Sequence, residues 1–352
     1  MNVLLLSPLP PPYGGMARWS ETVIDCCRDA GDISLDCIDT GHKVKDIVNR
    51  TVWQRYVHSV FRIVQIVREI SYRCRKTGYQ VAHVASSAEN GLIRDFFILK
   101  ALKRRGIKVV YHLHFGRYAE IKKAKTMEYR LLNSNMKKVD MVMAMDPITF
   151  NAIDNSFNKV FIPNPIRKEE FHISNRKKAI FIGYVVKNKG IEELLSAWGV
   201  LEKKYEGWTL QIVGQVDIEY LEYLKEKHPC VSVSFLGELE HETAMKHLRD
   251  SSVFVLPSYT EGFPYSVCEA MYSGKAIVST IVGAIPFMLA ENCGVVCPPQ
   301  DSESLLSSLE KVMGDEQYRI LLGNNAALRA QHLFSPEIVI KQYIDSWAQI
   351  SC

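Results

Sequence analysis

The sequence predicts an α/β fold with two doubly wound domains, in which helices cover both faces of a parallel sheet. Short apolar runs alternate with longer segments of helical periodicity along the chain, as expected for strand–helix–strand units. This pattern starts again after Ile162-Pro163-Asn164-Pro165, where two prolines favour a stiff turn. At 352 residues the chain is long enough for two domains of ordinary size.

Short apolar runs define the expected strands of the first domain, and segments with helical spacing lie between them. The strands are expected at Asn2–Leu6, Ser34–Ile38, Val81–Val84, Lys108–Leu113, Met141–Ala144 and Val160–Ile162. The helices are expected near Gly15–Ala30, Asp46–Lys76, Glu89–Arg105 and Lys125–Lys137. Helices that connect consecutive strands in this way favour a parallel sheet.

The second domain repeats the alternation. Its strands are expected at Ala179–Ile182, Thr209–Val213, Val231–Phe235, Val253–Leu256, Ala276–Ser279 and Gly294–Cys297. Helices are expected after most of these strands, for example at Gly190–Lys204 and Ser266–Tyr272. A last helix is expected at Pro336–Ile350, where apolar residues recur about a turn apart.

Composition and charge restrict the class of protein. A content of 47% hydrophobic and 23% charged residues is typical of a soluble globular protein. No secretory signal or membrane-spanning run is expected, so we predict a cytoplasmic protein with reduced cysteines, and any membrane contact on the inner face of the cell membrane. Residues 1–165 carry 25 Lys+Arg against 15 Asp+Glu, whereas the rest carries 18 against 24. The basic first half favours an anionic partner.

Two glycine-containing turns follow predicted strands. Gly14-Gly15 follows the first strand, and residues 183–190, with Gly183, Lys187 and Lys189, follow the first strand of the second domain. At such positions backbone N–H groups and a helix dipole favour a phosphate. A plain strand-to-helix turn is the alternative for both segments.

His112 and His114 lie at the end of a predicted strand and share one face, because side chains alternate along a strand. A metal pair lacks a suitably spaced partner cluster of Cys, Asp or Glu. We therefore expect one buried histidine and one functional histidine, with His114 at the edge of the crevice.

The segment from Pro257 to Ala270 carries the most information. It begins where the strand Val253–Leu256 ends, and glycine and proline then enforce a loop. Glu261 is expected in this loop and Glu269 one turn inside the following helix, where both carboxylates could accept hydrogen bonds from sugar hydroxyls. A surface acid is the alternative for Glu269, but its apolar neighbours indicate burial.

The basic segment Phe61–Lys76 interleaves arginines with apolar residues. It is compatible with a helix on a membrane surface. A helix that packs on its own domain, with the basic face in water, is the alternative.

Taken together, these features resemble a glycosyltransferase of family 4 over almost the whole chain. The similarity rests on Gly14-Gly15, His114, the linker 162–165, Lys189-Gly190, Phe235-Leu236-Gly237, the Glu-x7-Glu motif Glu261–Glu269 and Val282-Gly283-Ala284-Ile285-Pro286. The resemblance implies the GT-B fold, with two Rossmann-like domains facing a central crevice. Residues 1–165, with a helix at 336–352 that crosses back, would bind the acceptor, and residues 166–335 would bind a nucleotide sugar.

The resemblance also implies roles for single residues in retaining, metal-independent transfer that needs no cofactor. Glu269 would bind the donor ribose, and Glu261 the transferred sugar. Lys189 would neutralise the diphosphate, and His114 would touch the sugar or the acceptor. The other implied donor-binding residues are Gly14, Gly15, Gly183, Lys187, Gly237, Phe263, Pro264 and Tyr265.

One departure from the family pattern concerns the phosphate site. Tyr184 stands where family members usually have Arg, so either the missing cation lowers activity or Lys187 substitutes for it from a neighbouring position. A milder departure is Pro165, in place of a glycine.

The expected function is hexosyl transfer from a nucleotide sugar, a UDP-sugar before GDP-mannose, to a glycan or polyprenyl-diphosphate-linked acceptor. The product would be a surface polysaccharide such as lipopolysaccharide, O-antigen or capsule. The basic first domain would also meet an anionic membrane surface, and no nucleic acid is expected. Two alternatives remain: a non-catalytic nucleotide-sugar-binding or scaffold protein, suggested by Tyr184, and a sugar-nucleotide epimerase.

Overall fold

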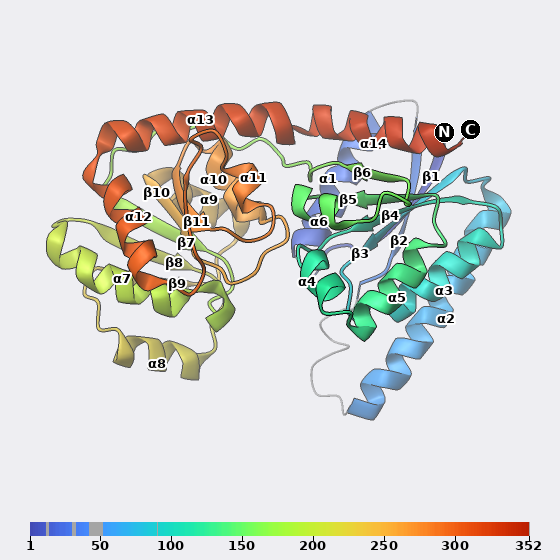
Figure 1. Cartoon of the computed structure of the whole chain (residues 1–352), viewed down its shortest axis with the longest axis horizontal. Coiled ribbons are helices and arrows are strands. Elements are labelled where there is room, and N and C mark those ends of the chain that lie inside the picture. The colour runs from blue at the N-terminus through green and yellow to red at the C-terminus, as the bar shows by residue number, and fades with distance from the viewer. Residues whose placement is uncertain (12–13, 30–32, 42–51, 90, 352) are drawn as a thin grey trace. The chain divides into compact units, whose positions relative to one another are not determined.

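The chain folds into two compact units. The structure, a computed structural model, describes residues 1–11, 14–29, 33–41, 52–89 and 91–351. One unit comprises Met1–Arg167 with Pro336–Cys352, and the other comprises Lys168–Ser335. Each unit contains a six-stranded sheet with helices packed against it (Figure 1).

The first unit contains a sheet in the order β2-β1-β3-β4-β5-β6, and every pair is parallel. Its strands are β1 (Asn2–Ser7), β2 (Ser34–Asp39), β3 (Val81–Ser86), β4 (Lys108–Leu113), β5 (Met141–Ala144) and β6 (Lys159–Phe161). All six residues of β3 are buried. Burial on both faces explains why β3 is mostly apolar, with His83 and Ser86 as its polar residues.

Helices connect and cover the strands of the first unit. They are α1 (Gly15–Asp29), α2 (Val52–Lys76), α3 (Gly91–Lys103), α4 (Tyr118–Lys123), α5 (Met127–Met136), α6 (Pro147–Ala152) and the C-terminal α14 (Pro336–Ser351). Thr126 and Asp146 begin α5 and α6 as N-caps, accepting hydrogen bonds from the N–H groups of the first turn. The last helix, α14, packs on α1, β3 and β4, with Tyr343 and Trp347 fully buried.

The second unit has the sheet order β12-β11-β10-β7-β8-β9, again parallel throughout. Its strands are β7 (Lys178–Ile182), β8 (Thr209–Val213), β9 (Val233–Gly237), β10 (Val253–Leu256), β11 (Ala276–Thr280) and β12 (Val295–Cys297). Counted within the unit, this is the order 3-2-1-4-5-6 of a dinucleotide-binding fold. The strand order reverses between β7 and β10.

Helices connect the strands of the second unit. They are the 3-10 turn η2 (Lys187–Lys189), α7 (Ile191–Lys204), α8 (Ile218–Lys227), α9 (His241–Asp250), α10 (Tyr265–Tyr272), α11 (Ile285–Met288), α12 (Ser302–Gly314) and α13 (Glu316–Phe334). The contacts of α12 with α7, and of α13 with α10, enclose much of the apolar core.

The observed elements correct two predicted boundaries. The strand expected at Val231–Phe235 begins only at Val233, because Val231 lies in a turn and is 95% exposed. The helix expected from Glu89 begins at Gly91, because the backbone of Ala88 and Glu89 is left-handed, with φ of 64° and 52°. The helix predicted near Asp46–Lys76 corresponds to α2, which is given from Val52. Residues 46–51 of this prediction lie outside the described residues.

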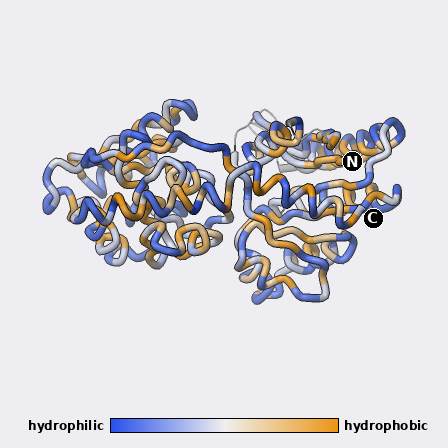
Figure 2. The backbone as a smooth tube through the Cα atoms, turned by 90° about the horizontal axis from the view of Figure 1, so that it is seen from above, coloured by the Kyte–Doolittle hydropathy of each residue, from blue (hydrophilic) through white to orange (hydrophobic). Residues whose placement is uncertain are grey.

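The hydropathy of the chain follows this architecture. Figure 2 shows hydrophobic stretches of backbone that alternate with hydrophilic ones. None of the helices in the described ranges has the length and apolar character to cross a membrane.

A buried lysine ties the linker to the second sheet. Lys275 is fully buried, and its Nζ donates hydrogen bonds to the carbonyl oxygens of His172 at 2.7 Å and Arg249 at 2.8 Å. Burial lowers the pKa of this ammonium group to about 8, against the opposing effect of Asp250. The two carbonyl groups therefore depend on a cation held in an unfavourable environment.

We predict that Lys275→Met lowers the free energy of unfolding by about 1–3 kcal/mol, because two carbonyl groups lose their donor. Urea unfolding at several pH values measures this. The lysine pKa is lower in the folded than in the unfolded protein, so the unfolded protein binds this proton more tightly. The stability advantage of the wild type over the variant should therefore grow from about pH 8 towards the ordinary lysine pKa of 10.5. An advantage that shrinks over this range would contradict the account.

Candidate functional site

The edge of the second sheet brings two predicted loops together. Strands β7 and β10 are hydrogen-bonded neighbours, with Ala179 opposite Val253 and Ile180 opposite Phe254. Their carboxyl ends therefore meet where the strand order reverses, which is where open α/β sheets bind ligands. The loop after β7 carries Lys189, and the loop after β10 carries Glu261.

An ion pair joins these two loops. Lys189 Nζ donates a hydrogen bond to Glu261 Oε1 at 2.6 Å, and Ser258 Oγ donates to the same oxygen at 2.7 Å. The two charged side chains are 22% and 11% exposed. Within the described part of the chain, Glu261 Oε2 has no hydrogen bond, so one carboxylate oxygen is available to a ligand hydroxyl.

Gly190 allows the lysine-bearing turn to lie against the β10 loop. Its backbone is left-handed, with φ of 70°, and it ends η2. A Cβ atom at this position would lie 2.0 Å from the carbonyl oxygen of Pro257. Tyr259 N donates to Asn188 O at 2.9 Å and fastens the same contact. A side chain at position 190 would therefore push Lys189 away from Glu261.

A second glycine turn supports Glu261 from the other side. Gly283 has φ of 53°, and a Cβ there would lie 2.2 Å from the carbonyl oxygen of Glu261. Ala284 N donates to Gly262 O at 2.8 Å. The backbone of Glu261 is thus held between two turns that follow other strands of the sheet.

Glu269 lies inside α10 and is 5% exposed, so it is not a surface acid. Its Oε1 lies 2.9 Å from Nε2 of His241, the first residue of α9. Sequence reasoning missed His241 and Ser258, because no motif marks a partner supplied by another helix or by a serine within a loop. Both orient a carboxylate at this edge of the sheet.

The N-terminus of α10 contributes backbone donors. Pro264 is the N-cap, and the first bond within the helix runs from Cys268 N to Pro264 O at 3.4 Å. The N–H groups of Tyr265 and the next two residues precede that bond, and they point along a dipole that favours anions. Phe263 is buried against the ring of Phe334, with centroids 5.3 Å apart, and fixes the start of the helix.

Within the described residues, Lys187 is not among the side chains that are hydrogen-bonded to Glu261. It is exposed at the start of η2. Lys227, through a hydrogen bond, and more weakly Lys187, hold the pKa of Glu192 below its ordinary value. Tyr184 is 56% exposed. That Lys187 replaces the missing arginine stays a prediction.

The two predicted glycines of the sheet edge occupy strand ends. Gly183 follows β7, and its N–H donates to Val213 O at 3.0 Å. Gly237 ends β9, and its carbonyl oxygen accepts from Gly214 N at 2.8 Å. Both therefore lie at the carboxyl edge that carries Lys189 and Glu261.

The remaining predicted residues belong to the first unit. Gly14 and Gly15 are exposed at the N-terminus of α1, where Arg18 N donates to Gly14 O at 3.0 Å. His114 follows β4 and is half-buried, whereas His112 is fully buried. The structure thus collects Lys189, Glu261 and Glu269 in one unit and places His114 in the other.

Burial keeps the histidines of the first unit neutral. It lowers the pKa of His114 to about 3, with a smaller contribution from His83, and it lowers the pKa of His83 itself to about 3. The pKa of His112 is well below its ordinary value for the same reason, with further contributions from the other two rings. Across the described ranges, no group of three or more His, Cys, Asp or Glu side chains is arranged to hold a metal ion.

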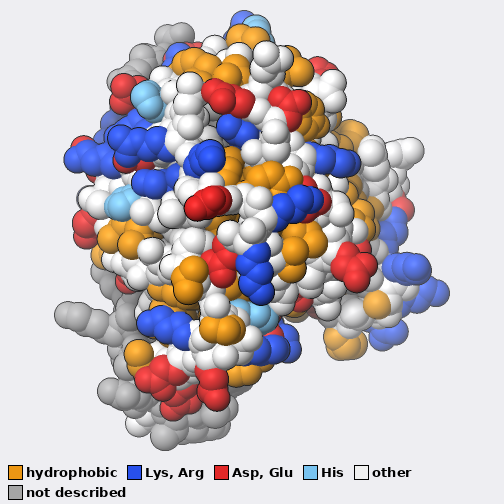
Figure 3. Space-filling view, turned by 90° about the vertical axis from the view of Figure 1, so that its left-hand side faces the viewer, with side chains coloured by type: hydrophobic (Ala, Val, Ile, Leu, Met, Phe, Trp, Pro, Cys, Tyr) orange, Lys and Arg blue, Asp and Glu red, His pale blue; other side chains and the backbone are white. Residues whose placement is uncertain are grey.

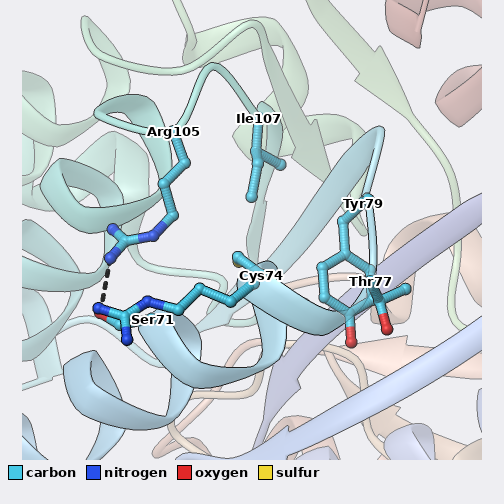
Figure 4. Close-up of a pocket in the computed structure, with 8 residues that line it drawn as sticks. Ser71, Cys74, Thr77, Tyr79, Arg105 and Ile107 are labelled. Atoms are coloured by element: carbon cyan, nitrogen blue, oxygen red, sulfur yellow. Dashed lines mark hydrogen bonds between the residues drawn. The ribbon is translucent and has the colours of Figure 1, made fainter.

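Two cavities on the first unit contain none of the predicted residues. One, of about 300 Å³, is lined by Ser71, Cys74, Arg75, Thr77, Gly78, Tyr79, Arg105 and Ile107 (Figure 4). Arg105 points across it and donates to Ser71 Oγ at 2.6 Å. The other, of about 420 Å³, is lined by Phe96, Leu99, Lys100, Lys103, Arg104 and Lys138.

We predict that Gly190→Ala lowers the free energy of unfolding by about 1–3 kcal/mol more than Gly207→Ala, as urea unfolding can measure. Both positions have left-handed backbone, with φ of 70° and 82°, so both variants carry the same strain of about 1–2 kcal/mol. At Gly207 the nearest atom to a new Cβ is Lys177 Cδ, at 3.8 Å, whereas at Gly190 the clash is with backbone. Equal losses would show that the turn does not depend on this close approach.

The second unit matches a known family. Residues 164–329 match the family model of glycosyl transferases group 1. Among curated relatives, the chain is 25% identical over 230 residues to the capsular polysaccharide biosynthesis glycosyltransferase CapM of Staphylococcus aureus, covering 61% of this chain and 57% of the relative. It is 27% identical over 206 residues to an N,N'-diacetylbacillosaminyl-diphospho-undecaprenol alpha-1,3-N-acetylgalactosaminyltransferase of Campylobacter jejuni, covering 54% and 52%. The chain thus spans little more than half the length of these relatives.

Solved structures resemble the whole chain. Sucrose-phosphate synthase from Thermosynechococcus elongatus has a TM-score of 0.80 at 18% identity and covers 99% of this chain and 98% of its own. The Anabaena protein HepE, solved in complex with UDP-glucose, has a TM-score of 0.73 at 15% identity, with coverage of 99% and 100%. The chain therefore has the GT-B fold, and residues 164–329 of the second unit are similar to glycosyl transferases group 1.

Proposed function

We propose that this chain is a retaining, metal-independent glycosyltransferase that moves a hexosyl group from a nucleotide sugar to a lipid-linked saccharide in the synthesis of a surface polysaccharide. The observation that carries the proposal is the pair Lys189–Glu261, held at the point of the second sheet where the strand order reverses. The CapM and Campylobacter relatives support the product and acceptor classes.

In the proposed complex, Glu261 and Glu269 serve opposite ends of the donor. Glu269, oriented by His241, accepts hydrogen bonds from the ribose hydroxyls. Glu261 keeps Oε1 on Lys189 and Ser258 and accepts a sugar hydroxyl at Oε2. Carboxylates suit this role because each oxygen accepts more than one hydrogen bond. A UDP-sugar is the preferred donor, supported by the UDP-glucose complex of HepE.

Lys189 and the N-terminus of α10 would stabilise the leaving diphosphate. As the bond between the anomeric carbon and the phosphate oxygen breaks, negative charge grows on the diphosphate. A half-buried ammonium group and oriented N–H groups stabilise this charge without reorganising solvent. The acceptor oxygen attacks from the same face, and its proton passes to the departing phosphate oxygen. Because the acceptor oxygen arrives on the face from which the diphosphate leaves, the anomeric configuration is retained.

We predict that two isosteric variants separate the roles of the acids. Glu269→Gln should weaken binding of UDP about 10- to 100-fold, the effect of losing one or two charge-assisted hydrogen bonds. Glu261→Gln should weaken binding of UDP-glucose while UDP affinity stays equal or rises, because Lys189 is released for the diphosphate. Isothermal titration calorimetry measures both. Glu242→Gln is the control, because Glu242 is exposed on α9 beside His241. Equal effects of both variants on UDP would contradict the assignment.

We expect transfer to proceed at full rate in EDTA, because the protein itself supplies the positive charge near the diphosphate. The rate should fall at least tenfold in Lys189→Ala, with or without added Mg²⁺ or Mn²⁺. The reason is that this cation stabilises the negative charge that develops in the transition state, and losing such a group usually costs more than a factor of ten in rate. Transfer assays with dialysed protein give both rates. Strict dependence on a metal, or restoration of the variant by one, would contradict the proposal.

The first unit offers a surface for a membrane-held acceptor. Exposed residues spaced three or four apart form one stripe along α2: Val57, Phe61, Val64, Arg68, Tyr72 and Arg75. Lys76 Nζ lies 4.5 Å from the centroid of the Tyr72 ring. Apolar residues followed by cations on one helix face suit the interface of an anionic membrane.

By contrast, Lys, Arg, Asp and Glu are interspersed on the face seen in Figure 3, from the side of α7, α8 and α12. We propose a peripheral location on the inner face of the cell membrane.

We predict that Phe61→Ser with Val64→Ser lowers binding to phosphatidylglycerol vesicles at least tenfold, because two exposed apolar side chains no longer enter the interface. Vesicle flotation measures this, with neutral phosphatidylcholine vesicles for comparison. Leu328→Ser, a matched change of an exposed residue on α13, should have no effect. Flotation that is absent in the wild type, or unchanged in the double variant, would contradict the membrane surface but not the donor site.

The scaffold alternative rests on Tyr184 and makes a different prediction. It expects binding of the nucleotide sugar through Glu261 and Glu269 with no turnover on any acceptor. Tyr184→Arg would then restore the cation common in the family and should raise turnover without changing the fold.

A further inference from the structure

A chain of buried hydrogen bonds in the first unit leads to His114. Trp347 Nε1, on α14, donates to His83 Nδ1 at 3.0 Å. His83 Nε2 lies 3.2 Å from His112 Nδ1, and His114 Nε2 lies 3.0 Å from the same His112 atom. His83, His112 and Trp347 are fully buried. Strands β3 and β4, the residue that follows β4 and the C-terminal helix therefore meet in one network.

The indole fixes the first proton of this chain. A tryptophan N–H can donate but cannot accept a hydrogen bond. His83 Nδ1 must therefore be the acceptor, and in a neutral imidazole the proton then sits on Nε2. His83 Nε2–H in turn donates to His112 Nδ1.

The proton of His112 follows from the same rule. Because His112 Nδ1 accepts from His83, the neutral ring carries its proton on Nε2. That atom is buried and has no hydrogen-bond partner within the described residues. An unpartnered buried N–H group costs free energy.

His114 then has one favourable proton position. If its Nε2 lacked a proton, two nitrogen lone pairs would face each other at 3.0 Å. His114 Nε2–H therefore donates to His112 Nδ1 and shares the single lone pair of that atom with His83 Nε2–H in a three-centre hydrogen bond, so the lone pair of His114 lies on Nδ1. No hydrogen bond to Nδ1 of His114 occurs in the described ranges, and the residue is half-buried, so this atom is open to a ligand. The low pKa values of the three rings keep the network neutral near pH 7.

Packing holds the rings in this arrangement. The Trp19 ring lies 5.4 Å from the centroids of His83 and His112 and 4.4 Å from that of His114. Trp19 Nε1 donates to Tyr343 OH at 3.0 Å, so the second indole is engaged elsewhere. Tyr343 and Trp347 lie one turn apart on α14, and both pack on the imidazoles.

We infer that Trp347, His83 and His112 are positioning residues that fix His114 in its Nε2–H form, so that Nδ1 accepts a hydrogen bond from a hydroxyl group of the saccharide substrate. The ligand class rests on the proposed function, whereas the proton position does not. A phosphate oxygen also accepts hydrogen bonds, so it would repel the lone pair on His114 Nδ1. His114 therefore does not bind the diphosphate. His114 thereby selects a hydroxyl donor, and Lys189 remains the group for the phosphate.

The test is long-range ¹H–¹⁵N NMR of the full chain with ¹⁵N-labelled histidine at pH 7, because the two neutral forms of imidazole give different nitrogen shifts and coupling patterns. His114 is assigned by its loss in His114→Gln. The expected result is a single Nε2–H form for His114. An Nδ1–H form or a charged imidazolium of His114 in the wild type would overturn the inference, independently of sugar transfer.

Two variants on α14 separate positioning from packing. Trp347→Phe removes the indole donor, so the single Nε2–H pattern of His114 should give way to a mixture of both neutral forms. Tyr343→Phe removes a buried hydroxyl group from the same helix but leaves the chain of nitrogens intact, and it should keep the wild-type pattern. An unchanged His114 pattern in a folded Trp347→Phe variant would overturn the role of Trp347.

Discussion

The ion pair between Lys189 and Glu261 depends on the topology of the second sheet. Only because β7 and β10 are neighbours do the two loops meet, and Gly190 then lets their backbones approach closely enough for the 2.6 Å contact. A partly buried pair gains Coulomb energy at the cost of desolvation, so it adds little to stability by itself. Its value lies in holding a cation and a free carboxylate oxygen ready for a charged, hydroxyl-rich ligand.

The two units differ in their chemistry. The second contains buried carboxylates, a half-buried lysine and a helix N-terminus, which suit an anionic nucleotide and its sugar. The first contains neutral histidines, a basic surface and an exposed apolar stripe on α2, which suit a saccharide carried by a membrane lipid. The first unit offers a neutral hydrogen-bond acceptor, His114 Nδ1, whereas the second unit offers a cation, Lys189. In the proposal, both units recognise hydroxyl groups, and the cation that recognises phosphate lies in the second unit.

Much of the fold could be predicted from the sequence, because buried parallel strands are continuous apolar runs. Each expected strand is present, and the errors at Val231 and Glu89 arose where an exposed turn or left-handed backbone interrupts an apolar pattern. The positions of Lys189 and Glu261 at the carboxyl edge of the sheet also followed from their places in loops after predicted strands. Partners distant in sequence could not be predicted: His241 reaches Glu269 from another helix, and Trp347 reaches His83 across 264 residues.

Sugar transfer by the proposed route requires that the edge of the second sheet bind a nucleoside diphosphate. Thermal unfolding of the full chain with UDP, UDP-glucose, GDP and GDP-mannose, in the wild type and in Lys189→Ala, measures this, since a ligand of the folded state raises its apparent stability. We predict that uridine compounds raise the melting temperature of the wild type and raise that of the variant much less. If no nucleotide raises the melting temperature of the wild type, or if the variant responds equally, the assignment of this site is contradicted.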